Sequence, residues 1–214
     1  MIGTLIVLAK EPVAGRVKTR LVPPFSHEQA AALAGAALRD TLRTAAYVDA
    51  QRRVLVFSGD PRGWAPDGWQ IVPQVDGELD LRLAAAFTHA GSGPTVLIGM
   101  DTPQFRPHQL PAFDDGYQAC LGMAVDGGFW AIGFTDPGVA AATVPGVRMS
   151  TSRTGADQLA RMRAGGLAVQ FLEPLVDVDT AADAKVVADA APDSEFARCL
   201  RRIPPGSHQA RPVT

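Results

Sequence analysis

The sequence predicts an α/β fold in which a mainly parallel sheet is flanked by helices. Three runs of apolar and β-branched residues, 2–9, 53–57 and 95–99, have the length and continuous hydrophobicity of strands buried on both faces. Segments with helical spacing of apolar residues separate them, as in Leu33, Leu38 and Leu42. Strands that alternate with helices are typical of βαβ units, so we expect a parallel sheet covered on both faces.

The rest of the chain continues this alternation. The expected strands cover residues 2–9, 53–57, 70–73, 95–99, 121–125, 129–134 and 168–172. The expected helices cover 79–90 and 107–119, and three more begin near Ser26, Thr154 and Thr180, the last ending near residue 190. Each of these three residues is followed three positions later by Gln29, Asp157 or Asp183, which predicts a capping box at each helix start.

Length and composition limit the function classes. A chain of 214 residues suits one domain over 1–202, followed by a flexible tail over 203–214 that is rich in proline and polar residues. The net charge of −2 argues against a nucleic-acid partner, and no apolar run is long enough for a membrane span. We expect a cytoplasmic protein in which Cys120 and Cys199 are free thiols, and a homodimer is possible.

A basic loop follows the first expected strand. The segment AKEPVAGRVKTRL places Lys10, Arg16, Lys18 and Arg20 around Gly15, close to the end of a buried strand. A glycine-containing loop lets backbone N–H groups approach phosphates, and nearby cations neutralise their charge. The spacing fits neither a P-loop nor a dinucleotide fingerprint, and a solvated basic loop is the alternative.

Carboxylates follow two other strands. Asp101 comes directly after the strand 95–99, and Asp177 and Asp179 follow the strand 168–172. Ligands of open α/β sheets bind at the carboxyl ends of the strands, and carboxylates suit Mg²⁺ or Mn²⁺. We therefore expect Asp101 to bind the metal, with Asp177 or Asp179 as a second ligand; the alternative is that Asp101 and Asp179 only cap turns and helices.

The segment AVDGGFW has two interpretations. Asp126, Gly127 and Gly128 are typical of a hairpin turn. The two glycines would also leave room for an acceptor against the backbone, beside the carboxylate of Asp126 and the ring of Phe129. Both interpretations stay open at this point.

The order of these motifs, with GELDLRL between the first and second, resembles a bacterial family usually described as nucleotide-diphospho-sugar transferase-like or glycosyltransferase-like. The resemblance covers about residues 3–190 and implies a GT-A type fold, a Rossmann-like mixed sheet shared by sugar-nucleotide glycosyltransferases and nucleotidyltransferases. It implies that Gly15, Lys18 and Arg20 bind the nucleotide's phosphates, and that Asp101 binds the metal. From their place in the same loop we also expect Ala9, Lys10 and Arg16 to bind the nucleotide. The chain departs from the family at Phe129, often tyrosine, at Met149, often tryptophan, and at Glu78 and Asp80, in a commonly Gly-Asp-Leu-Gly segment.

Three functions follow as expectations. The first is nucleotidyl transfer from a nucleoside triphosphate to a small phosphate or hydroxyl acceptor, in which Lys18 and Arg20 stabilise the departing pyrophosphate and Mg²⁺ or Mn²⁺ aligns the phosphates. The second is glycosyl transfer from a nucleotide-sugar, with Asp126 as the base and Gly127, Gly128 and Phe129 on the acceptor side. The third is nucleotide binding without catalysis.

Overall fold

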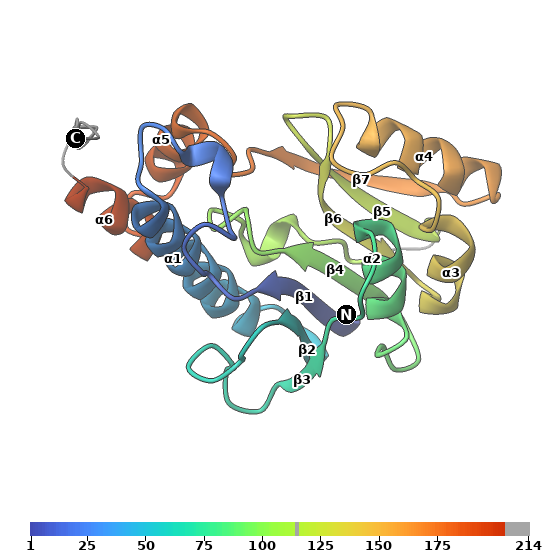
Figure 1. The fold of residues 1–214 in the computed structure, drawn as a ribbon. Coiled ribbons are helices and arrows are strands. Elements are labelled where there is room, and N and C mark those ends of the chain that lie inside the picture. The colour runs from blue at the N-terminus through green and yellow to red at the C-terminus, as the bar shows by residue number, and fades with distance from the viewer. Residues whose placement is uncertain (114–115, 204–214) are drawn as a thin grey trace.

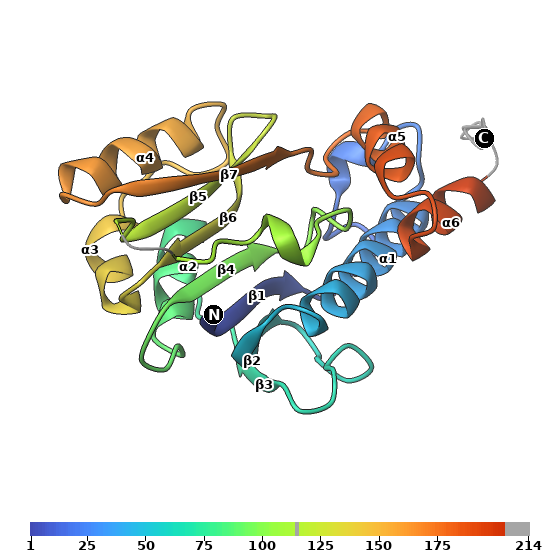
Figure 2. The same cartoon turned by 180° about the vertical axis from the view of Figure 1, so that it is seen from behind.

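The computed structural model describes residues 1–113 and 116–203. Its centre is a seven-stranded sheet in the order β3-β2-β1-β4-β6-β5-β7 (Figures 1 and 2). The strands are β1 (Ile2–Lys10), β2 (Ala50–Ser58), β3 (Gln70–Pro73), β4 (Thr95–Gly99), β5 (Ala119–Ala124), β6 (Phe129–Phe134) and β7 (Val169–Leu175). Only β6 runs against its neighbours β4 and β5, so the sheet is mixed and mainly parallel, as expected.

Helices cover both faces of this sheet. One group consists of α1 (His27–Ala46), α5 (Ala181–Ala190) and α6 (Glu195–Arg202), and the other of α2 (Leu79–Phe87), α3 (Ala140–Thr143) and α4 (Thr154–Ala164) (Figure 1). Neighbouring strand residues serve opposite faces: Leu5 and Val7 of β1 pack in the core with α1, while Ile6 packs in the core with α2. This alternation explains why the central strands are apolar without interruption.

The start of α1 follows from its sequence. Ser26 accepts a hydrogen bond from the backbone N–H of Gln29, and the Gln29 side chain accepts one from the backbone N–H of Ser26. Thr180 and Asp183 form the same arrangement at the start of α5. Two of the three predicted capping boxes are therefore confirmed.

Other predicted elements were wrong or had different bounds. The helix expected over 107–119 is only a 3-10 turn, Pro107–Gln109, and Ala119 already begins β5; residues 114–115 of that range lie outside the described residues. Pro111 explains the failure, because a proline inside a helix removes a hydrogen bond and its ring clashes with the preceding turn. β2 and β7 extend beyond the predicted strands, and α2 ends at Phe87 rather than at residue 90.

The capping box predicted for Thr154 and Asp157 is also wrong. Arg153 occupies the N-cap position and Thr154 is the first helical residue. The Thr154 hydroxyl instead accepts from the backbone N–H of Thr151 and donates to the carbonyl of Arg148, while Asp157 pairs with Arg153. Thr154 therefore fastens the preceding loop rather than the helix.

The last helix, α6, was not predicted. It has eight residues, and Ser194 caps it through a hydrogen bond from the backbone N–H of Ala197. Most of the expected tail, 204–214, lies outside the described residues. None of the helices in 1–113 and 116–203 has the length and hydropathy of a membrane span.

Candidate active site

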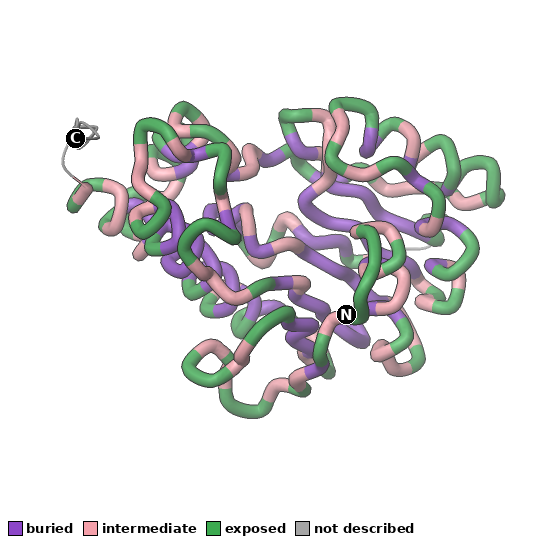
Figure 3. The backbone as a smooth tube through the Cα atoms, viewed as in Figure 1, coloured by how far each residue is buried: buried purple, intermediate pink, exposed green. Residues whose placement is uncertain are grey.

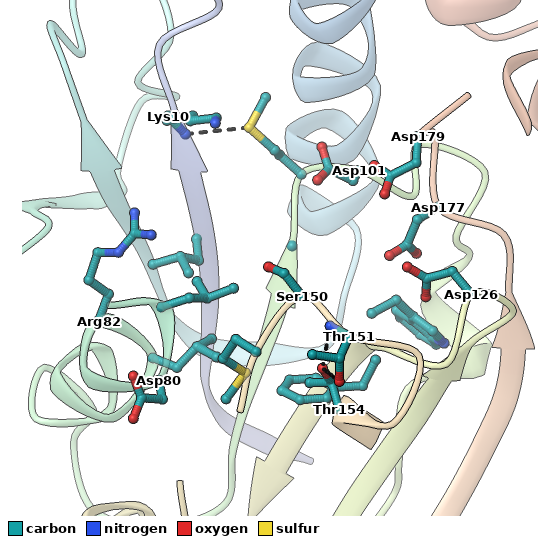
Figure 4. A pocket seen from close by; sticks show the side chains of 18 of the residues that line it. Lys10, Asp80, Arg82, Asp101, Asp126, Ser150, Thr151, Thr154, Asp177 and Asp179 are labelled. Atoms are coloured by element: carbon teal, nitrogen blue, oxygen red, sulfur yellow. Dashed lines mark hydrogen bonds between the residues drawn. The ribbon is translucent and has the colours of Figure 1, made fainter. Parts of the chain in front are cut away.

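A cavity of about 1140 Å³ opens at the edge of the sheet where the parallel strands end. β1 and β4 end there side by side, since Leu8 lies opposite Gly99. The antiparallel β6 begins at this same edge with Phe129, and the first turn of α2 and the loop 146–152 form further walls (Figure 4). Figure 3 shows the contrast between the buried strands and the more exposed segments around them.

Lys18 lies in the loop after β1, and its side chain lies along this edge of the sheet. Val17 and Leu21, both almost fully buried, anchor the loop on either side of it. The Lys18 backbone is in the left-handed region (φ 48°), and its side chain is only 8% exposed. Its ammonium lies 2.9 Å from Oδ1 of Asp101 and 3.2 Å from Oδ1 of Asp179. The Lys18 ammonium thus links the loop after β1 to the end of β4 and to the segment after β7.

This arrangement keeps Lys18 charged. Burial alone lowers the pKa of an ammonium, but the carboxylates of Asp101 and Asp179 outweigh it and raise the pKa of Lys18 above its ordinary value. Arg20 adds a second cation, with Nη1 lying 3.0 Å from Oδ2 of Asp179. Asp179 therefore pairs with two of the four basic residues, Lys18 and Arg20, and does not cap the helix, because Thr180 provides that cap.

Asp177 is the most perturbed acid of this edge. Its Oδ1 is buried and finds no hydrogen-bond partner among the described residues. Burial, and then the negative charges of Asp101 and Asp126, raise the pKa of Asp177 to about 7. Figure 4 shows the carboxylates of Asp126 and Asp177 turned toward each other on the cavity wall. A cation at this point would satisfy the orphaned oxygen and relieve the repulsion.

The donor set fits Mg²⁺ or Mn²⁺ bound by few protein ligands. No three acidic, histidine or cysteine side chains within 1–113 and 116–203 converge closely enough to hold a metal as they stand. Mg²⁺ usually takes only one or two protein carboxylates and completes its shell with waters and substrate phosphates. Asp101 and Asp179 already share the ammonium of Lys18, and Asp177 offers a free buried oxygen beside them.

Most of the predicted site residues meet at this cavity. Its lining includes Ala9, Lys10, Lys18, Arg20, Asp101, Asp126, Phe129, Asp177 and Asp179. Gly15, Arg16, Gly127 and Gly128 are not part of the lining. Gly15 adopts a positive φ of 77° that bends the loop, and the carbonyl of Arg16 accepts a hydrogen bond from the Lys10 ammonium at 3.3 Å.

The Asp126–Gly128 segment is the turn of the β5–β6 hairpin. Asp126 Oδ1 accepts a hydrogen bond from the backbone N–H of Gly128 at 2.8 Å. Gly127 has φ 92°, and a Cβ placed there would lie 2.1 Å from the carbonyl oxygen of Ser152. Gly127 therefore serves the close packing of this turn against the loop 146–152, while Asp126 and Phe129 face the cavity.

Several lining residues escaped the sequence analysis. Gln74 donates to the carbonyls of Ala9 at 2.7 Å and Val56 at 3.3 Å, and its side-chain oxygen accepts from Arg82. Gln74 follows directly on β3, so the strand-end rule that found Asp101 would also have found it. Arg82 lies in α2, where a lone arginine in a helix carries no such signal.

The loop 146–152 forms the remaining wall. It lies far from the other walls in sequence, and Ser150 in it has a left-handed backbone (φ 58°). Figure 4 shows Ser150, Thr151 and Thr154 gathered between the acidic side and α2. This loop adds the hydroxyl groups of Ser150, Thr151 and Ser152 to a cavity that also carries charged, apolar and other uncharged polar side chains.

Residues 32–151 match the family described as "Uncharacterized protein conserved in bacteria (DUF2064)". This match spans more than half of the chain. The chain belongs to the DUF2064 family. A search of curated proteins found no match to this DUF2064 protein.

Solved structures share the fold of this DUF2064 protein. A protein from Desulfovibrio desulfuricans G20, named "putative nucleotide-diphospho-sugar transferase", is 26% identical, with a TM-score of 0.83 over 94% of this chain and 95% of its own. A nucleotidyl transferase from Methanothermobacter thermautotrophicus is 15% identical, with a TM-score of 0.61 over 92% and 98%. A CMP:2-keto-3-deoxy-manno-octonic acid synthetase complexed with CTP is 12% identical, with a TM-score of 0.57 over 89% and 99%. The fold is thus that of nucleotide-diphospho-sugar transferases, as expected.

Proposed function

We propose that this DUF2064 protein is a metal-dependent transferase that uses a nucleotide, and that it transfers a nucleotidyl group from a nucleoside triphosphate to a small phosphate or hydroxyl acceptor. The observation that carries the proposal is the meeting of Lys18, Asp101 and Asp179 beside the unpartnered oxygen of Asp177. Cations and carboxylates that meet in one open cavity suit a substrate with several phosphates and a divalent metal.

Each residue then has a role. The acceptor oxygen attacks the α-phosphorus, the bond from that phosphorus to the bridging oxygen breaks, and pyrophosphate leaves. Lys18 and Arg20, which line the cavity, stabilise the negative charge that builds on the pyrophosphate. Lys10, at the end of β1, adds positive charge to the same wall of the cavity.

Asp101, Asp177 and Asp179 would hold the metal. When bound, Mg²⁺ or Mn²⁺ neutralises phosphate charge and orients the reacting groups. A structural neighbour from Mycobacterium tuberculosis, Rv0371c, has been solved as a complex with manganese; it is 23% identical with a TM-score of 0.50. That complex supports the choice of Mn²⁺ as the first ion to test.

Glycosyl transfer from a nucleotide-sugar is the second candidate. The name of the Desulfovibrio protein favours it, and so does the position of Asp126 on the cavity wall next to Phe129. Asp126 would then accept the proton of the acceptor hydroxyl, and a nucleoside diphosphate would leave. The two reactions are told apart by the released product.

The proposal is tested first by binding. Thermal unfolding is followed with each nucleoside triphosphate, nucleoside diphosphate and sugar nucleotide, with and without Mn²⁺. A ligand at about 100 times its Kd adds roughly 2.7 kcal/mol, which is a shift of about 5–10 °C. We expect a metal-dependent shift for one nucleotide, lost in Lys18→Ala and kept in Lys185→Ala, which alters an exposed lysine of α5.

Products are then measured with the nucleotide that binds. Release of pyrophosphate supports nucleotidyl transfer, and release of a nucleoside diphosphate supports glycosyl transfer. Stable binding without turnover across many acceptors would support a non-catalytic protein. The absence of any shift would refute the nucleotide site.

A further inference from the structure

The carboxylates assigned to the metal already hold a cation of the protein itself. The Lys18 ammonium lies between Asp101 and Asp179 at 2.9 and 3.2 Å. The Lys18 side chain is 8% exposed, whereas those of Asp101 and Asp179 are 42% and 29% exposed. Both carboxylates therefore remain open to the cavity while the lysine is enclosed.

The charges around Lys18 do not balance. Asp101, Asp126, Asp177 and Asp179 all line the cavity close enough for the other three to act on Asp177. Lys18 and Arg20 are the cations paired with this group. Lys10 and Arg82 also line the cavity, but their side chains donate hydrogen bonds to Arg16 and Gln74 and not to these acids. When all four acids are ionised, four carboxylates against their two paired cations leave an excess of two negative charges within the group, which equals the charge that a divalent ion brings.

The segments that carry Asp101 and Asp179 are linked independently of Lys18. The backbone N–H of Val178 donates to the carbonyl of Asp101 at 3.0 Å, so the segment after β7 is fastened to the segment after β4 by the main chain. Lys18, in contrast, reaches the acids through a flexible four-carbon stem from an irregular loop. The ammonium can therefore move without breaking the main-chain link between these two segments.

We propose that Lys18 is an exchangeable counter-ion: its ammonium holds Asp101 and Asp179 in the free protein, yields them to the divalent cation, and turns to the phosphates of the nucleotide. This inference rests on the proposed function. A metal ion and an ammonium repel each other at neighbouring positions, so the metal alone binds weakly and the nucleotide strengthens it by giving the ammonium new anionic partners. Metal and nucleotide binding are coupled through one side chain.

The test measures metal binding in the absence of nucleotide. Mn²⁺ is titrated into the full chain, and the free ion is followed by electron paramagnetic resonance. Lys18→Met removes the competing ammonium, so its Mn²⁺ Kd should fall roughly fivefold or more below that of the wild type, as for other coupled sites. Lys10→Met is the matched control. It removes one cation from the same cavity, and the Lys10 ammonium donates to the carbonyl of Arg16 rather than to a carboxylate.

Each outcome decides the inference. Tighter binding by Lys18→Met and not by Lys10→Met supports it, provided that adding Asp177→Asn to Lys18→Met abolishes the gain. Equal tightening in both lysine variants would reveal a general charge effect and overturn it. Unchanged or absent Mn²⁺ binding in Lys18→Met would overturn it too, since Lys18 would then be a permanent ion-pair partner. Circular dichroism checks folding, and Lys18→Gln replaces Lys18→Met should the latter unfold.

Failure of this inference differs from failure of the proposed function. A wild-type protein that turns over a nucleotide while Lys18→Met keeps its Mn²⁺ Kd refutes the exchange alone. A protein that releases no product with any nucleotide refutes the proposed function, whatever the Mn²⁺ titration shows.

Discussion

The carboxylate of Asp80, in the first turn of α2, accepts a hydrogen bond of 2.7 Å from the backbone N–H of Gly146. This bond fastens the start of the loop 146–152 to the opposite side of the cavity. Val147 adds a buried apolar anchor just beyond it. One wall of the candidate site therefore depends on a polar contact at the cavity rim.

Asp80→Ala should loosen this wall without unfolding the protein. Loss of the acceptor frees the Gly146 N–H, and amide hydrogen exchange over 146–152 should become faster. The free energy of unfolding should fall by about 1 kcal/mol or less, as is usual for one exposed hydrogen bond. Glu28→Ala, which removes an acid from the first turn of α1, is the control and should leave exchange in the loop as it was. Unaltered exchange over 146–152 in Asp80→Ala would show that the other contacts of the loop, those of Val147 and Thr154 among them, hold it without Asp80.

Asp177 should make the metal-free protein less stable as the pH rises. A carboxyl group with a pKa of about 7 in the folded protein and about 4 in the unfolded chain binds more protons when folded between these values. Its stabilising contribution is complete below about pH 4 and is lost as the pH rises through 7. Asp177→Asn carries no such charge, so above pH 7 its free energy of unfolding should exceed that of the wild type by on the order of 2–4 kcal/mol.

The measurement is urea unfolding of both proteins at pH 5, 6, 7 and 8 in the presence of a chelator. The difference between them should widen from pH 5 to pH 8. Parallel curves would mean that Asp177 is already ionised throughout this range.

Gly127→Ala should destabilise the protein more than an alanine substitution at another glycine with a positive φ. The new Cβ would meet the carbonyl oxygen of Ser152 at 2.1 Å, so the hairpin turn or the loop must move. Gly63→Ala is the matched control, since Gly63 also has a positive φ (80°) but nothing lies within 4 Å of an added Cβ. Thermal unfolding should show a cost of about 1 kcal/mol for Gly63→Ala and roughly 3 kcal/mol or more for Gly127→Ala. Equal costs would argue against the close contact with Ser152.

Asp40→Ala should weaken the attachment of α6 to α1. Asp40 is 4% exposed and accepts hydrogen bonds from the backbone N–H groups of Glu195 and Phe196, at 3.0 and 2.7 Å. Its loss leaves these donors buried without partners, with a cost of roughly 2–4 kcal/mol in urea unfolding. Asp189→Ala, which breaks an exposed ion pair with Lys185 in α5, should cost less than about 0.5 kcal/mol. A similar small effect for both substitutions would refute the capping role of Asp40.

The sequence predicted which strand ends come together at the cavity better than it predicted the contacts between their side chains. Strand ends could be located from apolar runs, and parallel strands bring their carboxyl ends to one edge, so Lys18, Asp101 and Asp177 could be grouped in advance. The pairing of Lys18 with Asp101 and Asp179 depends on a left-handed backbone in an irregular loop, which leaves no periodic pattern. The same holds for the loop 146–152, whose place is set by contacts with Asp80 and Gly127 that are distant in sequence.

The helices show a similar limit. Residues 107–119 combine apolar and helix-forming types, but Pro111 prevents the ladder of hydrogen bonds. Thr154 has the sequence of a cap, yet its hydroxyl binds the loop before it. α6 is short, and its start is held by Asp40, which lies 156 positions before Phe196. The local sequence around α6 therefore does not include the residue that stabilises it. Local signals succeed where the partner lies within one turn and fail where tertiary contacts decide.

Lys18 and Asp179 touch across 161 positions of chain, with six of the seven strands beginning and ending between them. During translation Lys18 is synthesised early, and Asp179 is synthesised only after β7. The nascent protein therefore carries its basic loop for most of its synthesis without Asp179, although Asp101 is made earlier. A fragment that stops between residues 175 and 179 keeps all seven strands but lacks the pairs of Lys18 and Arg20 with Asp179, which leaves Arg20 without its acidic partner and available to a polyanion nearby.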